Sequence, residues 1–217
     1  PTSEIQEWSL TSFLARFNYN YQGKYLLGAS IRRDGSSRFG AENKWGNFPS
    51  VSAGWVISQE SFLRDSKLIS FLKLRGSFGV SGNNNIGNYT QYPTGSSSAN
   101  SAFGATTASG VAVTNLGNDL LGWETTKQLD LGIDLALFNN RISLTYDYYN
   151  KKTSDLLFSL SVPRESGFSS FTGNVGEIRF WGHEFGVNSN NLVGKLKWST
   201  NFNIAFSDNK VLALSSL

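Results

Sequence analysis

The sequence predicts an all-β protein in which about eight long antiparallel strands form a segment of a transmembrane β-barrel. Two observations support this fold class. Apolar and polar side chains alternate with the two-residue period of a strand over much of the chain. The connections between the predicted strands also alternate between short and long, which is typical of outer-membrane barrels and which a soluble sandwich has no reason to keep.

Composition excludes several other classes of protein. The chain has 217 residues, a net charge of +3, one histidine and neither cysteine nor methionine. Without cysteine there is no disulfide framework, thiolate metal site or cysteine nucleophile, and so small a charge does not indicate a nucleic-acid partner. No apolar run reaches the roughly 18 residues that a membrane helix needs. Because the chain opens with Pro1, we expect it to be a processed or excised piece of a longer product.

Residues 9–21 and 25–34 are predicted to form the first hairpin, with a short turn at residues 22–24. In both segments every second side chain is apolar, so one face of the hairpin is apolar and the other polar. The apolar face comprises Phe13, Ala15, Phe17, Tyr19, Tyr21, Tyr25, Leu27, Ala29 and Ile31.

A second hairpin is predicted from residues 124–138 and 141–152, joined at Asn139 and Asn140. A two-residue turn there places only apolar pairs on one face and polar or small pairs on the other. The apolar pairs are Leu137 with Ile142, Leu135 with Leu144, Ile133 with Tyr146, and Leu131 with Tyr148. A shift of one residue would disrupt both faces, so the register is strongly specified.

Four further strands show the same alternation. They are predicted at residues 48–58, 71–81, 175–190 and 195–208. Residues 59–70 are expected to contain one or two helical turns and residues 191–194 a tight turn. The long connections are residues 35–47, 82–123 and 153–174, and residues 96–110 within them are expected to be a flexible surface loop. A band of aromatic side chains is expected at the short-turn rim, from Tyr19, Tyr21, Tyr25, Phe138 and Trp198.

Several motifs along the chain resemble the SusC/RagA family of TonB-dependent outer-membrane transporters. They are "RRDGSSRFG", "NKWGNFPSVSAGW", "SFLKLRGSFGVSGN", "LGWETTKQLDLGIDLALFNNRISLTYDYYNKKTSDLL" and "GNVGEIRFWGHEF", in that order. The resemblance implies a barrel of about 22 strands closed by a plug domain, energised by TonB and covered by a SusD-like surface lipoprotein. It places residues 1–217 within one barrel domain in the outer membrane, in its middle to later part, with the plug and N-terminal regions outside this chain.

Charged side chains on the polar side of the predicted strands are expected to face the barrel lumen. They are Arg16, Arg32, Lys73, Arg75, Asp130, Asp134, Asp147 and Glu184. With Lys197 on the same side, five basic residues face four acidic ones, so the charges nearly cancel. This suits a plug held by hydrogen bonds or the passage of neutral solutes better than a selective ion pore. We expect salt bridges between the basic and acidic members across the lumen wall.

Residues 32–48 are expected to be an outward loop anchored by Phe39, Trp45 and Phe48. The alternative is that Trp45 contacts the cargo or the lipoprotein. Tyr89 and Trp123 are further candidates for cargo contact, because aromatic side chains stack on sugar rings. Their surroundings, "SGNNNIGNYT" and "NDLLGW", are also ordinary loop-forming sequences.

We expect neither an enzyme nor a bound cofactor or metal ion. His183 and Glu184 lack the HExxH pattern, and a lone histidine cannot build a multi-histidine site. The predicted function is TonB-dependent import of a glycan, with import of a peptide as the alternative. Two hypotheses from other classes remain open: a passive porin or structural barrel of eight strands, whose small inward side chains would fill its interior poorly, and a β-sandwich adhesin.

Overall fold

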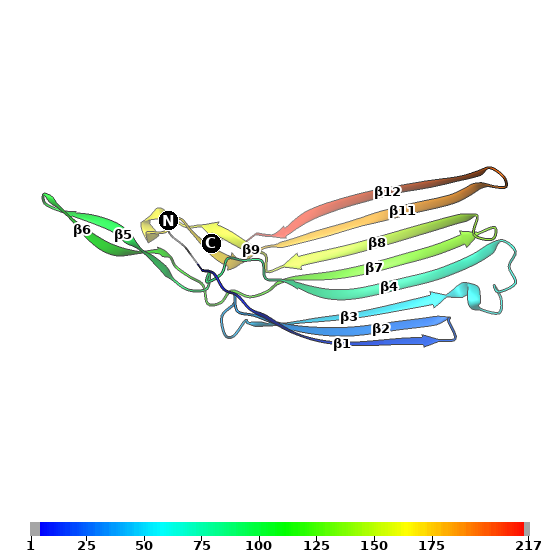
Figure 1. Ribbon diagram of the computed structural model, residues 1–217, viewed down its shortest axis with the longest axis horizontal. Helices are drawn as coiled ribbons and strands as arrows, with labels where there is room; N and C mark the ends of the chain where they lie inside the picture. The colour runs from blue at the N-terminus through cyan, green and yellow to red at the C-terminus, as the bar shows by residue number, and fades with distance from the viewer. Residues whose placement is uncertain (1–4, 215–217) are drawn as a thin grey trace.

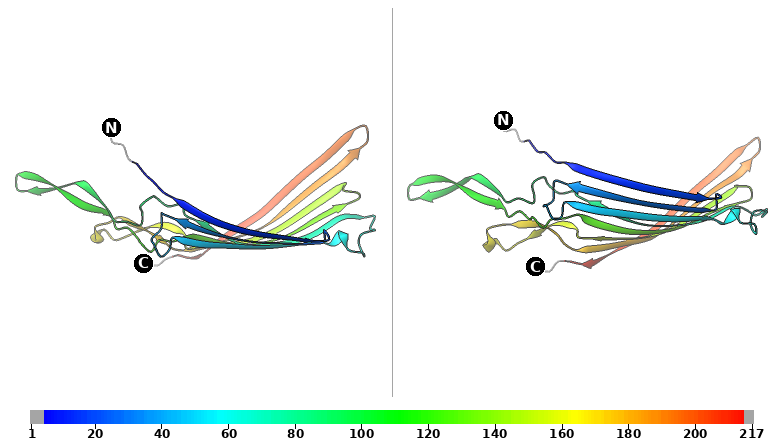
Figure 2. Two further views of the ribbon diagram at one scale, coloured as in Figure 1. Left: turned by 60° about the horizontal axis from the view of Figure 1, so that its bottom comes forward. Right: turned by 90° about the horizontal axis from the view of Figure 1, so that it is seen from below.

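The computed structural model describes residues 5–214, which form one antiparallel sheet and two small hairpins (Figure 1). The sheet has eight strands in the order β1-β2-β3-β4-β7-β8-β11-β12. Their bounds are β1 Leu10–Tyr21, β2 Tyr25–Ser36, β3 Trp45–Val56, β4 Ile69–Asn83, β7 Glu124–Leu137, β8 Ile142–Ser154, β11 Glu177–Val193 and β12 Lys197–Ala213. The sheet is a single layer bent into an open trough with a concave and a convex face (Figure 2). The predicted all-β antiparallel fold is confirmed.

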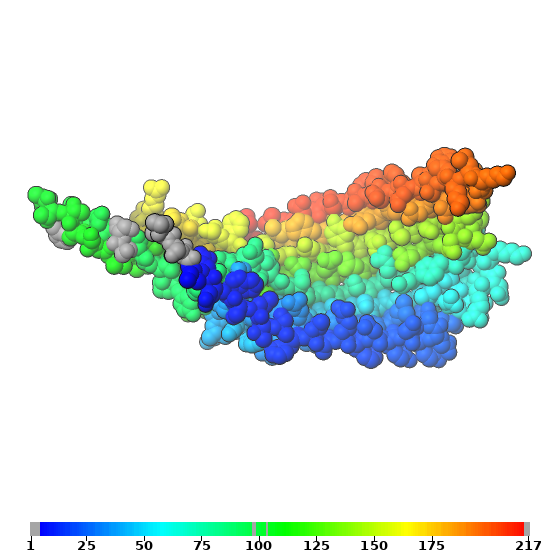
Figure 3. Space-filling model, in the orientation of Figure 1, coloured from blue at the N-terminus to red at the C-terminus, as the bar shows by residue number. Residues whose placement is uncertain are grey.

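The small hairpins lie beyond one end of the sheet and belong to its long connections. One pairs β5 (Thr94–Phe103) with β6 (Thr106–Asn115), and the other pairs β9 (Leu157–Ser161) with β10 (Ser170–Asn174). Figure 3 shows the first as a narrow arm projecting from the end of the sheet. The segment of residues 96–110, expected to be a flexible surface loop, lies in this projecting hairpin, and its flexibility stays a prediction. Its Ser, Ala and Gly side chains give no apolar alternation, although the backbone pairs as a ladder.

The connection between β3 and β4 contains less helix than predicted. It holds one short 3-10 turn, η1 (Ile57–Gln59), followed by hydrogen-bonded turns around Glu60. A second 3-10 turn, η2 (Arg164–Ser166), separates β9 from β10. No helix within residues 5–214 is long and apolar enough to cross a membrane.

The strands begin and end within a few residues of the predicted bounds, and the largest differences lie at the long-loop end. β3 starts at Trp45 and β12 continues to Ala213. At this end the backbone ladder continues beyond the residues that alternate between apolar and polar. Backbone hydrogen bonds can pair two strands even where neither face is apolar.

The predicted register of the second hairpin is confirmed. Leu137 pairs with Ile142 and Leu131 with Tyr148, as do the residues between them. The connection itself spans residues 138–141 instead of the expected two residues, and Phe138, Asn139 and Asn140 all have positive φ, at 53°, 56° and 62°. The Arg141 N–H donates to the Leu137 carbonyl at 3.0 Å and closes the turn.

The convex face leaves large apolar side chains uncovered. Phe17 is 62% exposed, Leu131 47% and Phe202 55%. In a sandwich these side chains would lie beneath a second sheet, but the described residues form a single layer. The β-sandwich hypothesis is therefore excluded for this part of the chain.

The buried core is small, and most of its apolar side chains lie at the long-loop end of the sheet. Phe39 and Phe48 are 2% and 8% exposed, and each ring centroid lies 5.2 Å from that of Trp123. Leu121 is fully buried, and the Trp123 indole N–H donates to the Lys44 carbonyl at 3.1 Å. This rim cluster (Phe39, Phe48, Leu121 and Trp123) joins the connection after β2 to the connection before β7.

Further hydrogen bonds tie the third long connection to the same rim. The Asn118 side chain donates to the Thr172 carbonyl at 2.9 Å. Asn174 accepts from the Gly122 N–H at 2.7 Å and donates back to the Gly122 carbonyl at 2.9 Å. The long connections thus form one assembly at their base.

The short-turn end is held by Glu60. Its carboxylate accepts hydrogen bonds from Lys24 Nζ at 2.9 Å, Tyr25 Oη at 2.7 Å and Trp55 Nε1 at 3.2 Å. The hydrogen bond from Lys24, followed by those from Tyr25 and Trp55, lowers the pKa of Glu60 from 4.5 to about 2. One side chain therefore links the β1–β2 turn to the β3–β4 connection.

Aromatic side chains follow this rim on the convex face. Tyr19, Tyr21, Tyr25 and Trp55 stack in sequence, with centroids 6.4 to 6.5 Å apart. Phe138 lies in the β7–β8 turn and Trp198 at the start of β12, so the expected aromatic residues all lie near the short turns.

A methyl group at Gly82 is expected to disrupt the rim cluster. It would overlap the Phe48 ring and lie 2.9 Å from the Trp123 ring, and overpacking of this kind costs about 1–3 kcal/mol. We expect Gly82→Ala in the intact protein to increase proteolytic cleavage of residues 84–123 about tenfold. Gly79→Ala is the control, since its methyl group would meet only Ser50 Cβ, at 3.5 Å. Equal cleavage of both variants would contradict this role of Gly82.

The lowered pKa of Glu60 predicts a specific pH dependence of stability. The carboxylate contributes stability above pH 4.5, its ordinary pKa, and loses it as the pH falls towards about 2. We expect the stability advantage of the unmodified protein over Glu60→Gln to shrink over that interval. Denaturant unfolding at a series of pH values measures it, with Asp65→Asn in the same connection as the control. An advantage that does not change with pH would refute the role of the carboxylate.

Candidate functional site

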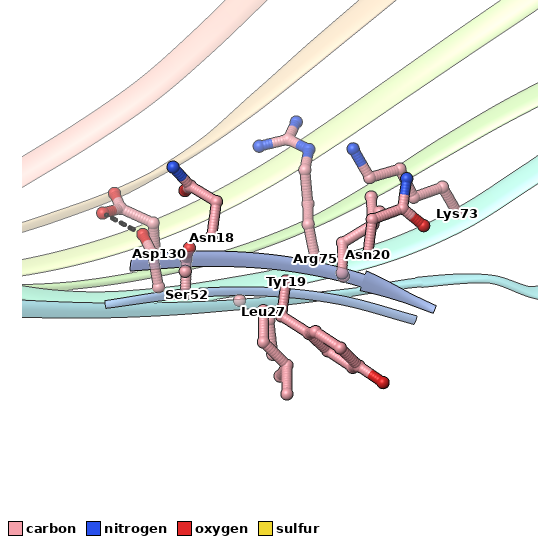
Figure 4. A pocket seen from close by; sticks show the side chains of 14 residues that line it. Asn18, Tyr19, Asn20, Leu27, Ser52, Lys73, Arg75 and Asp130 are labelled. Atoms are coloured by element: carbon pink, nitrogen blue, oxygen red, sulfur yellow. Dashed lines mark hydrogen bonds between the residues drawn. The ribbon is translucent and has the colours of Figure 1, made fainter. Parts of the chain in front are cut away.

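The concave face carries polar and small side chains across the width of the sheet. Figure 4 shows Asn18, Asn20 and Arg75 on the concave side, with Tyr19 and Leu27 projecting from the opposite side. The register aligns one row of concave residues over seven strands: Asn20, Leu26, Gly54, Arg75, Gly132, Asp147 and Glu184.

Small side chains hollow this face. A hollow of about 440 Å³ lies over β1 to β4 and is bordered by Gly28, Ser52, Gly54 and Ser77. Ser52 and Ser77 also border the next hollow along the strands, which in turn shares Ser50 with a third that reaches Trp123. A continuous trough therefore runs from the rim cluster towards the short turns. Larger side chains would fill it, since a Cβ at Gly28 would already lie 2.6 Å from Ser52 Oγ.

Arg75 is the centre of a charge network on this face. Its two terminal nitrogens contact the two Asp147 oxygens at 2.6 and 2.7 Å, in the forked geometry that guanidinium and carboxylate groups favour. Its Nε donates to Asp134 at 3.3 Å. The expected salt bridges across the sheet are present for Arg75, which reaches from β4 over β7 to β8.

Gly132 makes room for this reach. Arg75, Gly132 and Asp147 are direct neighbours on β4, β7 and β8. A Cβ at residue 132 would lie 2.5 Å from Arg75 Cζ and 2.7 Å from Asp147 Oδ1. The glycine therefore lets a long side chain lie flat against the sheet and pair with the next strand but one.

The other predicted charges on this face have separate surroundings. Asp130 accepts from Gln128 at 2.8 Å and from Ser77 at 3.3 Å. Lys73 lies over Gly54, where a Cβ would be 3.3 Å from Lys73 Cε. Glu184 lies opposite Asp147 on β11.

Two predicted arginines lie nearer the long-loop end. Arg32 donates to Asp34 at 2.7 Å and to Ser12 at 3.3 Å. Arg16 lies opposite Ser30 and borders the third hollow. All eight charged residues expected on one side of the sheet thus lie on its concave face.

The structure does not bring the three candidate cargo contacts together. Trp123 is packed within the rim cluster. Trp45 stacks on Phe13 of the convex face at 6.2 Å, and the Arg33 guanidinium lies 5.2 Å from its ring. Tyr89 lies apart from both, with its hydroxyl accepting from the Glu7 N–H at 3.2 Å.

Tyr89 belongs to a separate hollow outside the trough, which the sequence analysis missed. This outward hollow (Trp8, Arg38, Asn88, Tyr89 and Tyr92) has a volume of about 370 Å³. Arg38 stacks on Trp8 at 4.6 Å and donates to Asn88 at 3.0 Å, while Trp8 and Tyr92 are 52% and 56% exposed. Its members come from three separate segments, around residues 8, 38 and 88–92, so no local pattern could have associated them.

His183 and Glu184 are adjacent in β11 and lie on opposite faces of the sheet, so they do not form a joint site. Among residues 5–214, no group of three or more His, Asp or Glu side chains is arranged to hold a metal ion. His183 lies on the convex face, where its Nδ1 is 2.9 Å from the Tyr146 hydroxyl. Its ring also packs at 5.1 Å from that of Tyr148.

Comparison with known proteins gives a consistent result. The family model described as "TonB dependent receptor-like, beta-barrel" matches residues 1–213. TonB-dependent receptor P3 of Formosa agariphila is 44% identical over 99% of this chain and 21% of its own length. TonB-dependent receptor SusC of Bacteroides thetaiotaomicron is 35% identical over 95% of this chain and 21% of its own length. The chain therefore spans about a fifth of these relatives.

Solved structures agree with these relatives. The RagAB peptide transporter superposes with a TM-score of 0.87 at 30% identity, covering 97% of this chain and 23% of that one. The siderophore receptor PirA from Pseudomonas aeruginosa shares the fold at a TM-score of 0.60 and 14% identity. The relatives are receptors and transporters rather than enzymes, and β-barrels of this family are outer-membrane proteins. The chain thus belongs to the TonB-dependent receptor β-barrel family and is of the SusC/RagA type.

Proposed function

We propose that this chain is a section of the barrel wall of a TonB-dependent importer, which crosses the outer membrane as a multi-pass β-barrel. The observation that carries the proposal is a single-layer sheet with an exposed apolar convex face and a polar concave face. In water, an apolar face of this extent favours association. Against hydrocarbon it is stable, and the antiparallel ladder satisfies the backbone groups that lipid cannot.

The concave face is then the lumen wall. It carries four basic and four acidic residues of the predicted set, and the glycines and serines between them leave the wall hollow. Such a surface has room for a plug domain and offers it hydrogen-bond donors and acceptors. Its positive and negative charges nearly balance, so it produces no large net electrostatic field. Other parts of the full-length protein would supply the plug and the remaining strands.

Glycans are the proposed cargo, captured with a SusD-like lipoprotein. The outward hollow supports this choice, because exposed Trp8, Tyr89 and Tyr92 offer ring faces for stacking on sugars, with Arg38 and Asn88 as polar neighbours. A site of apolar rings with a few placed polar groups is typical of small-ligand binding. Peptide import is the second candidate, favoured by the likeness to the RagAB peptide transporter.

Uptake by cells that carry the full-length protein tests this function. Import of a labelled oligosaccharide that stops when TonB is inactivated is the expected result. Entry that persists without TonB would indicate a passive porin. TonB-dependent entry of a labelled oligopeptide without entry of the oligosaccharide would assign the protein to peptide import.

Replacing Tyr89 and Tyr92 together by alanine tests the outward hollow. We expect oligosaccharide uptake at low concentration to fall about tenfold, taking for each ring the roughly 0.5–1.5 kcal/mol typical of aromatic pairs. The control is Phe158→Ala, which removes an aromatic side chain that is 62% exposed on β9. An equal loss of uptake in the two variants would show that the outward hollow does not bind the transported oligosaccharide.

Gly132→Ala tests the role of the Arg75 network in the lumen. The added methyl group would displace the guanidinium from Asp147 at a cost of about 1–3 kcal/mol, leaving acidic groups that no longer match the plug. We expect greater entry of an antibiotic too large for passive porins, measured by growth inhibition. Gly79→Ala adds a methyl group to the same concave face, on β4, and should behave like the unmodified protein. Unchanged resistance in Gly132→Ala would show that the network does not seat the plug.

A further inference from the structure

Four basic residues form one row across the convex face near the long-loop end. Lys127 on β7 pairs with Lys152 on β8, Lys152 with Arg179 on β11, and Arg179 with Lys210 on β12. Each lies two or three residues from the end of its strand next to the long connections. This basic row (Lys127, Lys152, Arg179 and Lys210) therefore crosses four neighbouring strands at one height.

The basic row lies directly beyond the apolar band. Two residues along each strand towards the short turns, the convex row is Leu129, Asn150, Trp181 and Asp208. Six residues along, it is Ile133, Tyr146, Phe185 and Ile204. Six residues of strand span about 20 Å. The face thus changes from aliphatic and aromatic, through mixed polar and aromatic, to basic.

Like charges on directly opposed strand residues repel one another, and the sequence provides few acids to offset them. Lys152 forms a salt bridge with Glu177 at 2.9 Å. Arg179 donates to Asn150 at 3.1 Å and lies 5.2 Å from the Trp181 ring, so its described partners on this face are uncharged. Within residues 5–214, the bridge to Glu177 is the one salt bridge in this row.

We propose that the basic row binds the phosphate groups of an anionic glycolipid in the outer leaflet of the surrounding membrane. The inference rests on the proposed membrane placement, which sets these cations at headgroup height. Lys and Arg near an anionic lipid surface are strongly attracted to it, and both side chains bind phosphate. Four strands at a spacing of about 4.8 Å spread the charges over roughly 14 Å, wide enough for a headgroup with more than one phosphate.

The position of the row favours a lipid over a soluble anion. A soluble anion needs no adjoining hydrocarbon surface, whereas a lipid headgroup requires cations at the border of an apolar face. Trp181, in the intermediate row, has the amphipathic ring that is enriched at membrane interfaces. The row and the apolar band share the same strands and the same face, so one lipid molecule contacts both.

Lys151 provides a matched control. It is the chain neighbour of Lys152 at the same height, but it lies on the concave side, with its Nζ 5.5 Å from the Phe180 ring. Removing its charge changes the net charge and the local sequence in the same way as a change in the basic row. Compared with a single change in the basic row, it differs in the face of the sheet.

The test uses the full-length protein in detergent micelles and titrates diphosphorylated lipid A, followed by native mass spectrometry. The variant combines Lys127→Gln, Arg179→Gln and Lys210→Gln, which leaves the Lys152–Glu177 bridge in place. Each basic side chain at an anionic surface raises affinity about fivefold. We expect the triple variant to bind lipid A about a hundredfold more weakly, and Lys151→Gln to bind within about twofold of the unmodified protein, the scatter expected of a charge outside the site.

Three results would overturn this inference alone: unchanged affinity in the triple variant, an equal loss in Lys151→Gln, or displacement of lipid A by millimolar inorganic phosphate, which would indicate a free-anion site. Failure of the proposed function is detected separately. If the unmodified protein were absent from the outer-membrane fraction of fractionated cells, the membrane placement would fail, and this inference with it. Cargo uptake by the triple variant in cells provides a check on its folding.

Discussion

Backbone pairing in a single layer is the constraint on which the structure depends. Each strand is held by its neighbouring strands alone. Successive side chains point to opposite faces, so a residue's position along the strand decides whether its side chain lies on the convex or the concave face. Leu131 and Tyr148 form one cross-strand pair, and the adjacent pair, Gly132 and Asp147, lies on the opposite face. No second sheet covers the convex side of residues 5–214. The apolar side chains on this side are therefore removed from water only where something outside these residues, such as lipid, covers them.

This constraint explains where the tertiary core lies. A one-layer sheet can bury side chains within the chain itself only where its connections fold back on it, and Phe39, Phe48 and Trp123 meet at that place. At the opposite end, Glu60 gathers donors from the β1–β2 turn and from the adjoining ends of β2 and β3. The two ends are thus fixed by different means: packing where the connections are long, and a charge-assisted hydrogen-bond cluster where they are short.

The concave face shows how small residues shape the surface of a sheet. Glycine and serine leave the hollow over β1 to β4, and Gly132 lets Arg75 lie flat and reach Asp147. Long polar side chains can then form networks along the wall without blocking the space beside it. On the convex face the apolar band and the basic row follow one another along the same strands, so one ladder organises the proposed contacts with plug and lipid.

The sequence by itself determined the strands, the two faces and the register within hairpins, because the alternation is local and a tight turn fixes the pairing of Leu131 with Tyr148. It also placed eight charged residues together on one face of the sheet. Only the tertiary structure decided which residues from distant segments meet. Pairing of β4 with β7 across the long connection brings Arg75 to Asp147, and loop folding brings Trp8 beside Tyr89 and packs Trp123 in the rim cluster. Such contacts depend on how long connections close, and the local period of two carries no information about that.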